Sequence, residues 1–338
     1  MRKAVLLYNP RSGRRRSRRE ADVETVAGVL RAAGVDVIVS ETLGATRTAV
    51  QVSQQIADGC DTVIACGGDG TIHDVLQGLV GTGAALGIIP LGTANSLAKD
   101  LGLPNAPVAA ARALLTAKPR YVAVGHIVCK GDSGESISRY FTVTAGIGAD
   151  AEVFRNLKAD HKRYLGHAAY YVQATKLWLT HPFRRFVVHY KKEESGNPQA
   201  EAAQSQAVQA RAVQSHAVQS HAVQSEDVEV SQLLAVRIRN FGGLLRELAP
   251  GASLERDDLR LVLFRTHSRW AILSYALRAA LNAKWNIPDI DLAFADRVTC
   301  EPLPGYSSPI FVEADGEPLG TLPAEISLVP NALTLLMP

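Results

Sequence analysis

Two glycine-rich segments carry the residue types that point to chemistry in this chain. The first, Gly67–Thr71 (G-G-D-G-T), follows the apolar run Val63–Ala65 and precedes residues 72–80, which have helical spacing. Glycines let backbone N–H groups approach a phosphate, and a helix N-terminus favours the same anion. Asp69 adds a carboxylate that can hold a cation or accept a proton. A tight turn with a capping aspartate is the simpler alternative.

Two more loops strengthen the phosphate interpretation. Pro90–Asn95 also follows an apolar run and leads into a helical pattern, and Asn9–Gly13 follows the apolar residues 5–7. Loops at the carboxyl ends of neighbouring parallel strands meet at one edge of an open α/β sheet, so the three can share a ligand. Neither a G-x-G-x-x-G fingerprint nor a Walker A motif is present, which disfavours the ordinary dinucleotide-binding and P-loop classes.

With these loops the chain resembles the diacylglycerol kinase catalytic-domain family, in particular the soluble bacterial lipid kinases related to sphingosine and ceramide kinases. The order and spacing of the motifs fit over nearly the whole chain, apart from residues 193–228. The segments that carry the resemblance are Asn9–Gly13, Thr42, Gly67–Thr71, Pro90–Asn95, Gly146–Val153 and Asp315–Pro318. The resemblance implies an α/β fold: a doubly wound N-terminal nucleotide-binding domain plus a β-rich, sandwich-like C-terminal lipid-binding domain.

The resemblance also implies an ATP- and Mg²⁺-dependent lipid kinase that phosphorylates a hydroxyl of diacylglycerol or a related membrane lipid. It implies that Asp69 binds the metal ion and that Asp315 is the base that accepts the proton of the acceptor hydroxyl. The alternative that Asp69 is the base stays open. Asp150 and Glu317 fall on the side of the acceptor lipid. The residues expected around the nucleotide are Asn9, Ser12, Thr42, Gly67, Gly68, Gly70, Thr71, Gly92, Thr93 and Asn95.

Ser96 departs from the family pattern, which usually has Asp after the asparagine of the second loop. Because the missing carboxylate bears on metal organisation, a catalytically degenerate lipid-binding protein is one alternative. A kinase of a soluble substrate, related to NAD kinase, is another. It would share the G-G-D-G-T segment but would not account for Asp315–Pro318 or for the β-rich second half.

Composition indicates a soluble protein that needs no metal or disulfide for stability. The chain has 338 residues, a formal net charge of +3, and four cysteines without C-x-x-C spacing. It has no signal-peptide core and no long apolar span, so we expect a cytoplasmic enzyme with peripheral membrane contact. The basic stretch Arg11–Arg19 is either a solvated helix N-terminus or a site for an anion, which would be nucleotide phosphate or an anionic membrane surface. The stretch has no aromatic residues between its basic ones, which disfavours nucleic acid as its ligand. The oligomeric state stays open, and a homodimer is one alternative.

Alternating strands and helices predict the doubly wound domain over residues 1–120, and a β-rich pattern predicts the lipid-substrate domain over residues 121–318. The resemblance implies that the last strands, within about residues 319–338, return to complete the first domain. We expect strands at 3–8, 35–41, 62–65, 87–89, 121–129, 139–145, 185–190, 233–239, 259–264, 325–328 and 333–336, and helices at 18–33, 46–57, 72–79, 96–101, 164–179 and 269–284.

Two features of the second half concern composition rather than motifs. Repeats of the type A-V-Q-S-H fill residues 204–225, and a period of five suits neither a helix nor a strand. We therefore expect a low-complexity insertion in a β-hairpin, at about residues 193–228. The helices at 164–179 and 270–285 are amphipathic. They are either ordinary core helices or the walls of an apolar slot for acyl chains, with Trp and Tyr at its mouth.

Overall fold

The computed structural model describes residues 1–10, 18–156, 175, 180–191, 225–241, 247–281, 283, 286–305 and 308–338. Four features predicted from the sequence fall wholly or largely outside these residues. They are Ser12, the basic stretch before Arg18, the helix at 164–179 and the repeat at 204–224.

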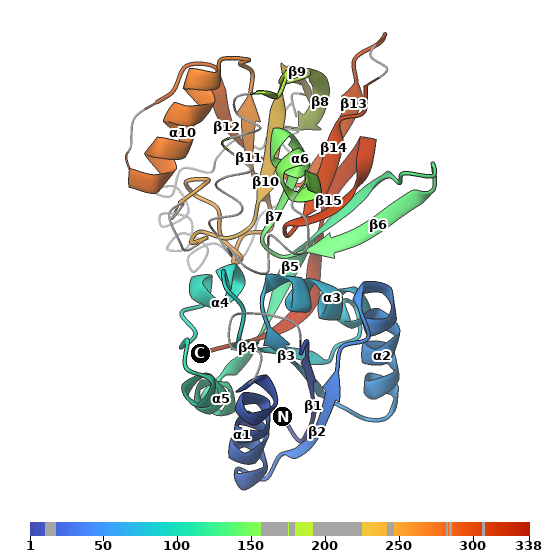
Figure 1. Ribbon diagram of the computed structural model, residues 1–338, viewed down its shortest axis with the longest axis vertical. Helices are drawn as coiled ribbons and strands as arrows, with labels where there is room; N and C mark the ends of the chain where they lie inside the picture. The colour runs from blue at the N-terminus through green and yellow to red at the C-terminus, as the bar shows by residue number, and fades with distance from the viewer. Residues whose placement is uncertain are drawn as a thin grey trace, which may run out of the picture.

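The lower half of the molecule in Figure 1 is a parallel sheet with helices on both faces. Its strands follow the order β4-β3-β1-β2, and every residue of β3 and β4 is buried, as in a sheet covered on both sides. The strands are β1 (Lys3–Tyr8), β2 (Asp36–Glu41), β3 (Thr62–Gly67) and β4 (Ala85–Pro90). The helices are α1 (Arg19–Ala32), α2 (Ala45–Ala57), α3 (Asp69–Leu79), α4 (Ser96–Asp100) and α5 (Pro107–Thr116).

Alternate residues of β1 enter two different cores, which shows that this domain is doubly wound. Val5 and Leu7 belong to the cluster with α2 and α3, whereas Ala4 and Leu6 belong to the cluster with α1 and α5. This is the period-two alternation expected of a strand buried on both faces. The N-terminal half of the predicted fold class is therefore confirmed, although helix α5 was not predicted.

The upper half is mainly antiparallel. Its strands are β5 (Lys118–Lys130), β6 (Ser136–Phe141), β7 (Thr144–Gly148), β8 (Phe186–Lys191), β9 (Ser225–Val230), β10 (Gln232–Val236), β11 (Leu259–Phe264), β12 (Ile290–Ala295), β13 (Arg297–Pro302), β14 (Phe311–Ala314) and β15 (Glu317–Met337). The described helices are α6 (Ala149–Asn156) and α10 (Arg269–Leu281). Strands β12-β11-β10-β7-β14-β15 run side by side, and β5 and β13 also pair with β15.

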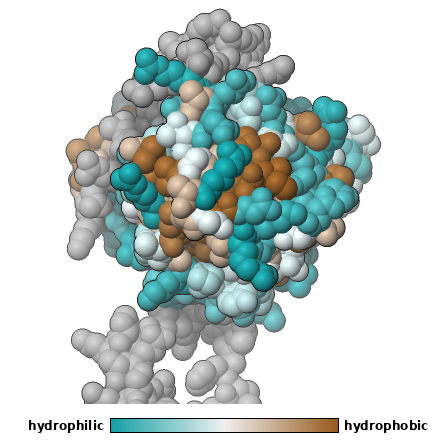
Figure 2. Space-filling view, turned by 90° about the horizontal axis from the view of Figure 1, so that it is seen from below, coloured by the Kyte–Doolittle hydropathy of each residue, from teal (hydrophilic) through white to brown (hydrophobic). Residues whose placement is uncertain are grey.

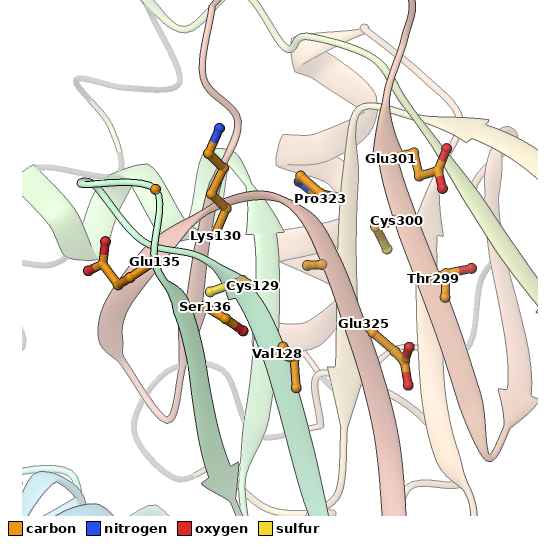
Figure 3. Close-up of a pocket in the computed structure, with 12 residues that line it drawn as sticks. Val128, Cys129, Lys130, Glu135, Ser136, Thr299, Cys300, Glu301, Pro323 and Glu325 are labelled. Atoms are coloured by element: carbon orange, nitrogen blue, oxygen red, sulfur yellow. The ribbon is translucent and has the colours of Figure 1, made fainter.

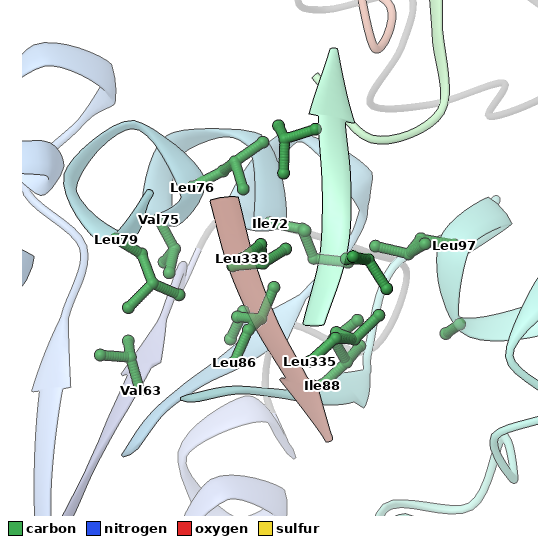
Figure 4. Close-up of a cluster of buried hydrophobic side chains, with 14 of the residues drawn as sticks. Val63, Ile72, Val75, Leu76, Leu79, Leu86, Ile88, Leu97, Leu333 and Leu335 are labelled. Atoms are coloured by element: carbon green, nitrogen blue, oxygen red, sulfur yellow. The ribbon is translucent and has the colours of Figure 1, made fainter. Parts of the chain in front are cut away.

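Strand β15 joins the two halves. It begins beside β14, pairs with β5 along most of its length, and ends parallel to β4 at Thr334 and Leu335. In Figure 4, Leu333 and Leu335 lie among the core side chains that β3, β4 and α3 contribute. The end of the chain therefore completes the hydrophobic core of the first domain.

Three expectations about the second half need correction. The predicted strand at 139–145 is two strands, because the N–H groups of Thr142 and Val143 donate to the Asp315 carboxylate and the chain leaves its ladder there. The two predicted final strands are the single strand β15, which has an irregularity between Val329 and Leu333. Strands β9, β12, β13 and β14 were not predicted.

The hairpin around the insertion is formed by β8 and β9, which pair antiparallel with Lys191 opposite Ser225. The insertion was expected to end at about residue 228, and strand β9 (Ser225–Val230) lies across that end. Val228 and Val230 pack on the main hydrophobic core of the antiparallel half, and this burial holds the segment in the sheet.

Within the described part of the chain, no helix is long and apolar enough to cross a membrane. Seen from the end of the first domain that faces away from the second, the surface shows a central apolar area surrounded by hydrophilic residues (Figure 2).

Candidate functional site

The two glycine-rich loops touch backbone to backbone at the carboxyl edge of the parallel sheet. The N–H groups of Leu91 and Gly92 donate to Gly67 O at 2.8 and 3.1 Å. A Cβ at Gly92 would stand 2.3 Å from Gly68 Cα, so the approach requires glycine. Asn95, at φ 52°, holds the second loop: its Oδ1 accepts the Gly92 N–H at 2.9 Å and its Nδ2 donates to Gly92 O at 3.2 Å.

Asp69 connects the N-termini of two helices. It is the first residue of α3, and its Oδ1 accepts the N–H groups of Ser96 and Leu97, in the first turn of α4, at 2.7 and 3.4 Å. Burial and the charge of Asp315 raise the pKa of Asp69 above its ordinary value, although the Ser96 N–H opposes the shift. The ionised form of Asp69 is therefore disfavoured by its surroundings, and a cation or a proton bound to the carboxylate at this edge would stabilise it.

The other residues expected at the nucleotide lie along the same edge. Asn9 follows β1, and Thr42 follows β2, where its N–H donates to Tyr8 O at 2.9 Å. Thr71 is buried behind Gly67, whose missing Cβ leaves room for the Thr71 side chain. Thr93 stands next to Gly92 in the second loop.

Arg19 contacts the second loop through a hydrogen bond to its backbone. Its side chain is 2% exposed, and one guanidinium nitrogen donates to Leu91 O at 2.8 Å. Burial lowers the pKa of Arg19. Arg19, the last residue of the basic stretch, therefore lies in the interior of the first domain, where it donates to a backbone carbonyl.

Asp315 lies in a two-residue turn between β14 and β15. Asp315 and Gly316 have φ values of 51° and 80°, the left-handed conformations that an Asp-Gly hairpin turn requires. The Asp315 side chain is 2% exposed. Its Oδ1 accepts the N–H groups of Val143 and Thr144 at 2.8 and 3.1 Å, and its Oδ2 accepts that of Thr142 at 3.0 Å. The carboxylate therefore fixes the corner between β6 and β7.

His73 links this corner to the first glycine-rich loop, and sequence reasoning missed it. It lies one turn after Asp69 on α3, and its Nδ1 is 3.5 Å from Asp315 Oδ2. Burial disfavours the imidazolium, but the hydrogen bond and charge of Asp315, with Glu317 and Asp74 nearby, raise the pKa of His73 overall. The available signal was the spacing of four residues from Asp69, which puts both side chains on one face of the helix.

More carboxyl groups surround the Asp315 turn. Glu317 Oε1 lies 3.2 Å from the position that a Cβ of Gly70 would take. Burial, with the charge of Glu317, raises the pKa of Asp74 to about 6. Asp150, in the first turn of α6, and the fully buried Glu313 complete the group, and Glu313 is a second residue that sequence reasoning missed.

In the described part of the chain, the candidate residues do not form a ready-made metal cage. Among the described residues, no three His, Cys, Asp or Glu side chains are arranged to hold a metal ion. A cavity of about 390 Å³ lies on the second domain and is lined by β5, β6, β13 and β15 (Figure 3). None of the predicted site residues that the structure describes lines it. The candidate site is instead the open edge where the two loops meet.

Comparison with known proteins agrees with both halves of this architecture. The model for the diacylglycerol kinase catalytic domain matches residues 3–127, and that for the YegS C-terminal NAD kinase beta sandwich-like domain matches residues 142–337. A probable lipid kinase YegS-like protein of Pseudomonas putida is 37% identical over 151 residues, which cover 44% of this chain and 48% of that protein. A diacylglycerol kinase of Mycobacterium tuberculosis is 29% identical over 343 residues, covering 99% of this chain and 95% of that protein.

The fold also matches a solved structure. A putative diacylglycerol kinase from Bacillus anthracis superposes with a TM-score of 0.72 at 21% identity, covering 99% of this chain and 95% of that one. The chain spans about half or less of the length of the YegS-like relatives from Pseudomonas putida and Chromohalobacter salexigens. Since the two domain models match in tandem and together span most of the sequence, the chain belongs to the diacylglycerol kinase catalytic-domain family and carries a YegS-type C-terminal domain.

Proposed function

We propose that the protein is a lipid kinase that transfers the γ-phosphoryl group of ATP to a hydroxyl of diacylglycerol or a related membrane lipid. The observation that carries this proposal is the contact between the two glycine loops at Gly68 and Gly92, with Asp69 joining the N-termini of α3 and α4. Membership of the family supports it, as do relatives named lipid kinase and diacylglycerol kinase.

The chain's own groups account for binding of the nucleotide. Backbone N–H groups at the start of α3 favour a phosphate, and the glycines of both loops allow it to approach the main chain. Asn9 and Thr42 lie at the ends of the neighbouring strands, where they would contact the rest of the nucleotide. Thr71 and Thr93 would add side-chain contacts in the two loops.

The donor set fits Mg²⁺ that arrives with the nucleotide. Mg²⁺ commonly takes one or two protein carboxylates and completes its shell with phosphate oxygens and water. Asp69 would hold it, because both of its hydrogen bonds to α4 end on Oδ1 and do not involve Oδ2. The ion would neutralise charge on the phosphates during transfer.

We also propose that Asp69, rather than Asp315, acts on the acceptor hydroxyl. Phosphoryl transfer relies mainly on positioning and charge. The carboxylate that acts on the acceptor hydroxyl must therefore lie close to the phosphoryl group that is transferred. Asp69 begins α3 directly after Gly67 and Gly68, whereas the Asp315 side chain is enclosed and its oxygens already accept three backbone N–H groups. Asp315 and His73 would then position the corner of the second domain against α3, and Asp150 and Glu317 would face the acceptor.

Helix α10 supplies a candidate surface for peripheral membrane contact. One face packs on β10 and β11 through Tyr275, whose ring contacts that of Phe264 on β11. On another face, Trp270, Leu277 and Leu281 are 70%, 52% and 62% exposed. An exposed apolar helical face with an aromatic residue suits the interface of a bilayer, from which the acceptor lipid would enter.

The test is to incubate the purified protein with radiolabelled ATP and a total lipid extract, with NAD and other soluble acceptors in parallel. We expect the label in the organic phase, in one lipid product. Label only in a soluble product would establish the NAD-kinase-like alternative. A lipid that co-purifies with the protein, together with no turnover on any acceptor, would establish a degenerate lipid-binding protein.

A further inference from the structure

Glu313 is a buried acid that the proposed phosphoryl transfer does not use. It lies on β14 opposite Gly146 of β7, and no part of it is exposed to solvent. Its Oε2 accepts the Gly316 N–H at 2.7 Å. Its Oε1 is enclosed and has no hydrogen-bond partner in the described part of the chain. A buried oxygen of this kind is unfavourable unless a proton or a donor satisfies it.

The unpartnered oxygen and Asp150 Oδ2 lie close to the same point, beside Gly146. A Cβ on Gly146 would stand 2.7 Å from Glu313 Oε1 and 2.9 Å from Asp150 Oδ2. The two carboxyl groups therefore face the same gap above a glycine. Two ionised carboxylates in an enclosed place repel each other, whereas one shared proton removes the repulsion and supplies the missing hydrogen bond.

The electrostatic surroundings agree with this geometry. Burial and the charge of Asp150 hold the pKa of Glu313 well above its ordinary value. Asp315 in the turn and Glu317 on β15 act in the same direction, while the Gly316 N–H acts against them. The acids facing Glu313 thus come from α6, from the turn and from β15.

We propose that Glu313 is a neutral carboxylic acid whose Oε1–H donates to Asp150 and so positions Asp150 at the start of α6. Because Oε2 holds Gly316, one side chain then ties α6 to the turn that carries Asp315. The effect on catalysis rests on the proposed function, in which Asp150 meets the acceptor lipid. Glu313 is a positioning residue in this account: ionisation at alkaline pH releases Asp150 and raises KM for the acceptor more than it changes kcat.

Glu313→Gln tests the protonation state directly. The amide keeps a donor for Asp150 and an acceptor for Gly316 but cannot ionise. The infrared difference between the wild type and this variant at neutral pH should contain the carbonyl stretch of a protonated carboxyl group. The matched control is Glu325→Gln, which replaces a carboxylate paired with Arg297 at 2.7 Å and should leave that band in place.

Thermal stability gives a second readout. A folded-state pKa above the unfolded value means that the folded protein keeps a proton that the unfolded chain loses, so wild-type stability falls as pH rises from the ordinary value of a glutamate toward the raised one. Glu313→Gln removes this loss. Its melting temperature should exceed that of the wild type at neutral and alkaline pH, and the difference should close at acid pH.

Activity then shows whether the contact matters for the acceptor. Glu313→Ala should raise KM for the lipid several-fold, and Glu313→Gln should restore it and flatten its alkaline rise. The absence of the infrared band, or a melting-temperature difference that does not vary with pH, would overturn the proposal. Neither readout needs kinase activity, so a protein that phosphorylates no lipid would refute the proposed function without deciding this one.

Discussion

Replacing Asp315 by Asn separates a structural role of this residue from a catalytic one. The carboxylate accepts three backbone N–H groups and lies 3.5 Å from His73 Nδ1. An amide keeps one acceptor oxygen and presents an NH₂ group on its other side, so it must face at least one of these N–H groups with a second donor. A hydrogen bond lost from a charged, buried group costs about 1.5–3 kcal/mol.

This loss should be visible as a lower melting temperature. At about 2–4 °C for each kcal/mol, the shift is a decrease of about 3–12 °C. At a temperature well below the transition, kcat/KM should fall, mainly because KM for the acceptor lipid rises. Scanning fluorimetry and steady-state kinetics on the same preparation measure both quantities.

Asp227→Asn provides the matched control. Asp227 also pairs with a histidine, His189, at 2.7 Å, but its side chain is 67% exposed. Such a surface pair contributes about 1 kcal/mol or less, so the control should melt close to the wild type. An Asp315→Asn protein that melts like the wild type and yet has no turnover would refute this reasoning and make Asp315 the base.

Three further predictions concern other parts of the chain. Deleting residues 204–224 and rejoining the ends with a short Gly-Ser link should change stability by less than about 1 kcal/mol, because loop-closure entropy depends weakly on length; a large fall in melting temperature would show that the segment is structural. Ser96→Asp should lower the Mg²⁺ concentration for half-maximal activity, since Ser96 lies at the Asp69 carboxylate; an unchanged requirement would contradict this. Exchanging both Leu273 and Leu277 for Glu should abolish sedimentation with anionic phosphatidylglycerol vesicles, whereas Leu115→Glu, which alters an exposed leucine of α5, should not; equal binding by all three proteins would remove α10 from the membrane surface.

Local sequence was enough to predict the glycine loops and the sheet edge that carries them. Gly67–Thr71 and Pro90–Asn95 each stand between a buried strand and a helix, and the strand–loop–helix order fixes their place in a parallel sheet. The doubly wound domain follows from the same alternation. The helix-forming pattern of α10 was also readable from residue spacing, but which of its faces is exposed depends on the neighbouring strands.

The second half of the site depends on contacts between distant residues. His73 and Asp315 are 242 positions apart, so no pattern in either segment shows that they meet. The split of residues 136–148 into two strands has the same cause, because the side chain that interrupts the ladder lies far along the chain. Glu313 resembles an ordinary strand residue until β14 is paired with β7, which places it against Gly146 and Asp150.

The proposal that Asp69 is the reacting carboxylate has one most direct test. Wild-type protein and Asp69→Asn are incubated with radiolabelled ATP, Mg²⁺ and a total lipid extract, after scanning fluorimetry has confirmed that both are folded. We expect one labelled lipid from the wild type and none from Asp69→Asn, because the substitution removes the carboxylate that lies between the first glycine-rich loop and α4. Labelled lipid from Asp69→Asn at a rate near that of the wild type, or no labelled lipid from the wild type, would contradict it.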